Sequence, residues 1–145
     1  MQTFGKRDYN LQYKKRIGSY AIIKNTEDKF LVVEDEDGNF YLIGGGIEDG
    51  ETPLETLVRE SVEETGYKIR IAQFLGQAEK YWVSQKYPEW SQHNIGYFYM
   101  CPLLEKISEP IEKERMSWVS FTDLEKHLFH EHHLYMVKKS LDFWD

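Results

Sequence analysis

Residues 45–67, GGIEDGETPLETLVRESVEETGY, hold the strongest structural signal in the chain. They predict a helix, because Thr52 is a good N-cap, Pro53 suits the first helical position, and Glu55 completes a capping box with Thr52. Gly66 is a natural residue to end a helix, since it adopts the left-handed conformation without strain. We therefore expect a helix that begins at Pro53 and ends just before Gly66.

This predicted helix has two chemically different faces. At 100° per residue its apolar and small side chains gather on one side, which we expect to face a sheet: Leu54, Leu57, Val58, Ser61 and Val62. Glu60, Glu63 and Glu64 gather on the other side, at the i, i+3 and i+4 spacing that places Cβ atoms about 5–6 Å apart. Because hard cations such as Mg²⁺ and Mn²⁺ prefer carboxylate oxygens, the three acids are candidate metal ligands. The alternative is an acidic helix face that only water solvates.

The acidity of the chain is concentrated in the same stretch. The formal net charge is -7 for 145 residues, and residues 45–67 contain seven acids and one base, Arg59. An acidic protein is a poor general binder of nucleic-acid polymers. No apolar run reaches the roughly 20 residues that span a bilayer, and a lone cysteine, Cys101, forms no internal disulfide. We expect one domain over residues 1–145, in the cytoplasm, without a membrane partner.

Outside this stretch the pattern alternates between strands and helices. Strands are predicted over six segments, with a tight turn at Asp37-Gly38: residues 16–24, 29–34, 39–43, 67–83, 94–104 and 117–121. Residues 123–143 predict one helix or two, with these candidate inward residues: Leu124, Leu128, Leu134, Val137 and Leu141. The first dozen residues are typical of a loose arm or an edge strand. The order of elements predicts an α/β fold with a mixed sheet covered by helices.

The glycines before the helix predict a flexible loop: Gly44, Gly45, Gly46 and Gly50. Such a loop at a helix N-terminus lets backbone N–H groups approach an anion. This loop is itself acidic, with Glu48, Asp49 and Glu51. We therefore expect phosphate to be bound through a metal ion rather than by the loop directly.

With these residues in view, the stretch resembles the Nudix box, G-x5-E-x7-R-E-U-x-E-E-x-G-U, in which U is a bulky apolar residue. All seven fixed positions are present: Gly45, Glu51, Arg59, Glu60, Glu63, Glu64 and Gly66. Ser61 stands at a position that is usually apolar, and we expect its hydroxyl to bond back to a helix carbonyl. Ile43 stands where the family commonly has proline. The resemblance implies an α/β/α sandwich with a mixed central β-sheet.

The resemblance also implies an activity, the hydrolysis of a nucleoside diphosphate linked to another moiety, with Mg²⁺ or Mn²⁺. It makes Glu60 and Glu64 the first metal ligands and Glu63 a ligand or the general base. Arg59 is expected to orient the acids through a salt bridge to Glu51. A MutT-like nucleoside triphosphate pyrophosphatase is the leading hypothesis. The alternatives are a hydrolase of a nucleotide sugar or dinucleoside polyphosphate, and a catalytically idle nucleotide-binding sensor.

Family members often add one more metal-binding acid, from a loop before a strand that contains tryptophan. Here that strand holds Trp118, and Glu112 is the candidate, with Glu109 and Glu114 as rivals. Family members are also often dimers, so a homodimer is an expected assembly.

Two further groups of residues invite a functional interpretation. Aromatic side chains stack nucleobases for roughly 1–3 kcal/mol each, so Tyr81, Trp82 and Tyr97, with Gly45 beside them, are candidate substrate-binding residues. Alternating aromatics on strands also form cores, which is the competing interpretation. Four histidines near the C-terminus lack partner cysteines, and their helical phases scatter: His127, His130, His132 and His133. They predict a solvated helix end rather than a zinc site.

Overall fold

The computed structural model describes residues 1–84, 89, 91–111 and 115–144. Its strands are β1 Gln2–Phe4, β2 Tyr13–Ile22, β3 Phe30–Glu34, β4 Phe40–Gly46, β5 Tyr67–Ile69, β6 Gln73–Trp82, β7 Ser91–Met100, β8 Leu103–Lys106 and β9 Arg115–Val119. Its helices are α1 Pro53–Thr65, α2 Phe121–His127 and α3 Glu131–Ser140. None of the helices in the described ranges has the length and hydrophobicity needed to cross a membrane.

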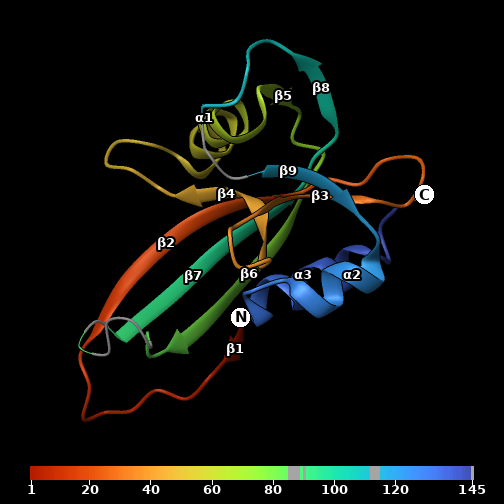
Figure 1. The fold of residues 1–145 in the computed structure, drawn as a ribbon. Helices are drawn as coiled ribbons and strands as arrows, with labels where there is room; N and C mark the ends of the chain where they lie inside the picture. Colours follow the sequence, from red (N-terminus) through yellow and green to blue (C-terminus); the bar gives the residue numbers. More distant parts are fainter. Residues whose placement is uncertain (85–88, 90, 112–114, 145) are drawn as a thin grey trace.

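Seven strands form one mixed sheet in the order β1-β6-β7-β2-β4-β3-β9. Strand β2 runs parallel to β7 and antiparallel to β4, which joins the two halves of the sheet. Helix α1 covers one face and helices α2 and α3 cover the other (Figure 1). Each face has its own core, with Leu57 of α1 in one and Met136 of α3 in the other. The predicted α/β/α sandwich is confirmed.

Two of the predicted strands are divided in the structure. Residues 67–83 form β5 and β6, and residues 94–104 form β7 and β8. Pro102 lies between β7 and β8 and has no N–H to donate to a ladder, which favours a break there. Strands β5 and β8 then pair with each other in a separate two-stranded sheet. At the N-terminus, β1 is an edge strand that pairs in parallel with β6, in agreement with one of the two expectations.

The inward face of α1 differs from the prediction. Leu54 and Val58 are 44% and 47% exposed, whereas the buried residues of the helix are Thr56, Leu57, Ser61, Glu64 and Thr65. The periodicity gives the relative phase of side chains but not which sector meets the sheet. Here Glu64 accepts a hydrogen bond from the Gly44 backbone N–H at 2.8 Å. That bond turns the acidic side of the helix toward β4.

The C-terminal region also differs from the prediction. His132 and His133 are 1% and 2% exposed, so the expected solvated helix end is wrong for these two residues, whereas His127 is exposed. Helix α3 begins at Glu131, and its inward stripe therefore includes both histidines, with ring contacts to Phe98 on β7. Leu141, expected to face inward, lies just past the helix and is 43% exposed.

Candidate active site

The turn from β4 into α1 has the local structure that the sequence predicts. Thr52 accepts a hydrogen bond from the Glu55 backbone N–H at 3.2 Å, and Glu55 accepts one from the Thr52 backbone N–H at 3.2 Å. Pro53 opens the helix, and Gly66 ends it with a φ of 78°. Both ends of α1 are thus fixed by local chemistry, so the acids of its middle and last turns are held at defined positions.

Arg59 connects the acids of the loop and the helix. Its Nε donates to Oε2 of Glu51 at 2.7 Å, and its Nη1 donates to Glu60 at 3.0 Å and to Glu63 at 3.2 Å. The hydrogen bond from Arg59 is the main reason that the pKa of Glu51 falls to about 2. Glu51 in turn raises the pKa of Arg59. The predicted orienting role of Arg59 therefore has a direct geometric basis.

The predicted glycine loop is wrong for its first three residues, because Gly44, Gly45 and Gly46 form the end of β4 and pair with β2. Glu60 and Glu64 both pack against this glycine end of β4. A methyl group added at Gly45 would lie 2.7 Å from Oε1 of Glu60, closer than real Cβ atoms come to other atoms. The Gly44 backbone N–H holds Oε1 of Glu64 at 2.8 Å, and Glu64 is only 8% exposed. The absence of side chains on these glycines lets the end of β4 pass directly over the carboxylates.

Tyr20 on β2 is a site residue that the sequence analysis missed. Burial first, and then the charges of Glu64 and Glu60, raise the pKa of its hydroxyl to about 12, so the group stays protonated at neutral pH. Its ring lies over Gly18, where an added methyl group would come within 2.5 Å of the Tyr20 hydroxyl oxygen. Strand alternation places Tyr20 on one face of the sheet, but only the fold brings it to the acids.

Ser61 fills its buried position in a different way from the one expected. Its hydroxyl donates to the backbone carbonyl of Tyr67 at 2.9 Å, beyond the end of the helix, rather than to a carbonyl one turn back. Thr65 makes the backward bond instead, to the Ser61 carbonyl at 2.6 Å. The small polar residue thus links α1 to β5.

The donor set suits a hard divalent cation. No three His, Cys, Asp or Glu side chains within the described ranges already surround one point as a metal would require. Glu60 and Glu63, however, both bond to the same cationic nitrogen, Nη1 of Arg59. This shows that positive charge is accommodated between them, and carboxylate oxygens are the ligands that Mg²⁺ and Mn²⁺ prefer.

The candidate fourth acid, Glu112, lies outside the described residues, as does its rival Glu114. Glu109 forms an ion pair with Lys106 at 3.0 Å. The loop that leads to these positions contacts α1, because the Ile111 backbone N–H donates to the Glu63 carbonyl at 2.7 Å.

The predicted aromatic residues do not form one wall. Tyr81 stacks on His93 with ring centroids 4.1 Å apart, on the face of the sheet that also carries Tyr97. Trp82 points to the opposite face, where its ring lies 5.9 Å from that of His130. Neighbouring residues on a strand face opposite ways, so these three side chains have no common surface.

A cavity of about 360 Å³ adjoins Glu64 instead. Its walls include Glu64, Gly44 and Gly45 together with the rings of Tyr20, Tyr41, His130 and His133. Both ring nitrogens of His133 are buried without a hydrogen-bond partner in the described part of the protein. Burial lowers the pKa of His133 well below its usual value, so the ring is neutral and can both donate and accept.

Known proteins resemble this chain in sequence and in fold. A family model described as the NUDIX domain matches residues 14–139. A curated Bacillus subtilis protein, "Putative 8-oxo-dGTP diphosphatase", is 26% identical over 104 residues, which cover 71% of this chain but only 65% of that protein. A NUDIX hydrolase from Nitrosomonas europaea has a TM-score of 0.73 at 16% identity, with 90% of each chain covered. A MutT protein from Methanosarcina mazei has a TM-score of 0.70 at 20% identity, with 93% and 99% covered. The chain belongs to the Nudix hydrolase family and has a MutT-like fold.

Proposed function

We propose that the chain hydrolyses a phosphoanhydride bond in a nucleoside diphosphate linked to another group, with Mg²⁺ or Mn²⁺ held by Glu60, Glu63 and Glu64. The main support is the convergence of Glu60 and Glu63 on a single cationic nitrogen of Arg59, with Glu64 anchored beside them on the glycine end of β4. When bound, the metal ions neutralise phosphate oxygens and lower the pKa of a coordinated water.

Within this proposal each residue has a separate role. Glu63 is the candidate general base, because its side chain is 30% exposed, against 14% for Glu60, and can exchange protons with water. Arg59 positions the acids through its bonds to Glu51, Glu60 and Glu63. The bare backbone at Gly45 leaves room for the Glu60 carboxylate beside the end of β4.

The nucleoside is proposed to enter the 360 Å³ cavity beside Glu64, which is in the size range of small-molecule sites. Its aromatic and imidazole walls offer stacking surfaces to a base. The named relatives act on different nucleotides: besides the curated protein above, solved structures include an ADP-ribose pyrophosphatase and a UDP-X diphosphatase. A MutT-like nucleoside triphosphate pyrophosphatase is the proposed activity.

The test is the release of phosphate or pyrophosphate from a panel of nucleoside triphosphates, nucleotide sugars and dinucleoside polyphosphates with millimolar Mg²⁺. Glu64→Gln keeps an oxygen that accepts the Gly44 N–H but loses the charge, so turnover should fall at least 100-fold with little loss of folding stability. Glu105→Gln, an exposed acid on β8, is the matched control. If wild-type protein binds nucleotides but turns over none of the panel, the chain is a sensor and the proposed activity is wrong.

A further inference from the structure

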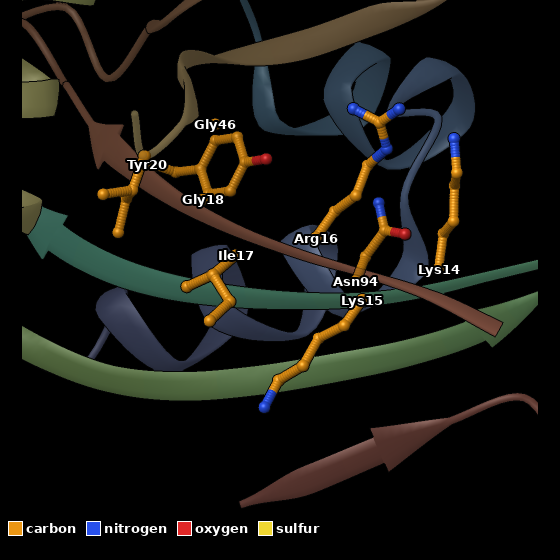
Figure 2. A pocket seen from close by; sticks show the side chains of 9 residues that line it. Lys14, Lys15, Arg16, Ile17, Gly18, Tyr20, Gly46 and Asn94 are labelled. Atoms are coloured by element: carbon orange, nitrogen blue, oxygen red, sulfur yellow. The ribbon is translucent and has the colours of Figure 1, made fainter. Parts of the chain in front are cut away.

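A second cavity, of about 560 Å³, lies along the end of β2 (Figure 2). Three consecutive bases line it, Lys14, Lys15 and Arg16. Gly46 at the end of β4 and Ile47 after it also line this cavity. All three bases are exposed, in a chain whose formal net charge is -7. Basic residues are therefore gathered at one place on an otherwise acidic protein.

One wall of this cavity is formed by Lys14, Arg16 and Asn94. Alternation along β2 places Lys14 and Arg16 on one face of the sheet and Lys15 on the other. Asn94 is the register partner of Arg16 on β7. Figure 2 shows these three side chains pointing to the same side of β2, while Lys15 points to the opposite side.

The wall offers hydrogen-bond donors. Asn94 accepts a hydrogen bond from Nε1 of Trp82 at 3.1 Å through its Oδ1, which leaves the amide nitrogen as the group available to a ligand. No carboxylate in the described ranges lies within ion-pair distance of the Arg16 guanidinium. Guanidinium, ammonium and amide N–H groups in one row match the oxygens of a phosphate.

This cavity adjoins the acid site described above. Gly46, which borders it, directly follows Gly45, against which Glu60 packs. Tyr20 lines both this cavity and the one beside Glu64. A chain of phosphates held at the acids can therefore continue into the basic cavity.

We infer that Lys14, Arg16 and Asn94 bind a phosphate group that lies beyond the hydrolysed diphosphate. The inference rests on the proposed function and narrows it to substrates with at least three phosphates. Both a nucleoside triphosphate and a dinucleoside polyphosphate present that group. A nucleotide sugar places a neutral sugar there, which gains little from the two charges.

The test compares kcat/KM for a nucleoside triphosphate, a diadenosine tetraphosphate and UDP-glucose in wild type, Arg16→Gln and the double variant Lys14→Gln/Arg16→Gln. Removing a charge-assisted hydrogen bond should lower kcat/KM for both polyphosphates about tenfold, and UDP-glucose should change less than twofold. If kcat/KM falls more for the nucleoside triphosphate than for diadenosine tetraphosphate, the wall binds a terminal phosphate. If kcat/KM falls equally for both, the wall binds an internal phosphate. Lys126→Gln makes the same charge change at an exposed position on α2, outside the lining of this cavity, and should change kcat/KM for each substrate less than twofold.

A separate binding measurement keeps this inference distinct from the activity. Inorganic tripolyphosphate, titrated by calorimetry with and without Mg²⁺, should bind Arg16→Gln about tenfold more weakly than wild type. Equal losses on UDP-glucose and polyphosphates, or equal tripolyphosphate affinity in all variants, would overturn the inference. If wild type hydrolyses nothing, the proposed activity fails, and tripolyphosphate affinity alone decides whether the wall binds phosphate.

Discussion

The carboxylate of Glu60 packs directly against the backbone of Gly45, where an added methyl group would lie 2.7 Å from Oε1 of Glu60. Gly45→Ala should therefore displace Glu60 and lower kcat/KM at least tenfold, while circular dichroism shows an unchanged fold. Gly46→Ala is the comparison, because a methyl group there meets no atom within 4 Å. It should lose far less activity. Similar kinetics for the two variants would show that the contact with Glu60 does not matter.

Arg59→Ala tests the compensation of charge among the acids. Without the guanidinium, Glu51, Glu60 and Glu63 repel one another, so the metal-free protein should melt at a lower temperature. The rise in melting temperature on adding millimolar Mg²⁺ should be larger than in wild type, because the cation then supplies charge that Arg59 supplied before. Arg59→Lys keeps the charge but not the two-pronged geometry, and should melt between the two. An unchanged melting temperature for metal-free Arg59→Ala would contradict this account.

The buried histidines make stability depend on pH. Burial lowers the pKa of His130 to about 4 and that of His132 to about 3, below the value near 6.5 in the unfolded chain. The unfolded chain therefore binds more protons below pH 6.5, and the free energy of unfolding should fall as the pH drops from about 6.5 toward 4. The slope approaches about 1.4 kcal/mol per pH unit for each histidine that stays neutral.

Urea unfolding at pH 7.5 and pH 5.0 measures this effect while most carboxylates stay ionised. His132→Phe should reduce the pH dependence by removing one of these groups. The same slope in wild type and variant would show that His132 does not contribute.

Ser61→Ala tests the link between α1 and β5. It removes the hydroxyl that donates to the Tyr67 carbonyl, in a position that is fully buried. The free energy of unfolding should fall by about 1 kcal/mol, the usual net value of such a bond. Thermal or urea unfolding would measure it. A more stable variant would mean that an apolar residue fits this position better, as the usual family pattern suggests.

The sequence predicts the structure best where local chemistry decides it. The capping box at Thr52, the stop at Gly66 and the Arg59–Glu51 ion pair all depend on residues close in sequence, and each is present. The outward position of Leu54 and the inward position of Glu64 were not predicted, because the rotation of α1 depends on contacts with distant residues, such as the hydrogen bond from Gly44 to Glu64. Local spacing carries no information on such a bond.

Long-range packing also explains the remaining differences. The burial of His132 and His133 depends on where α3 begins and on aromatic partners from β2 and β7. The proposed roles of Tyr20 and Arg16 depend on the pairing of β2 with the glycine end of β4 and with β7. This pairing joins segments far apart in the chain. The basic segment at residues 14–16 matches no motif, so the cavity that it lines could not be predicted from the sequence.

Glu60, Glu63 and Glu64 are proposed to bind divalent metal ions. Mn²⁺ binding followed by electron paramagnetic resonance, in the presence of a non-hydrolysable nucleotide, tests it without relying on turnover. Wild type and Glu105→Gln should bind Mn²⁺ equally, and Glu60→Gln and Glu64→Gln should each bind at least tenfold more weakly. Equal Mn²⁺ affinity in all four proteins would contradict the claim.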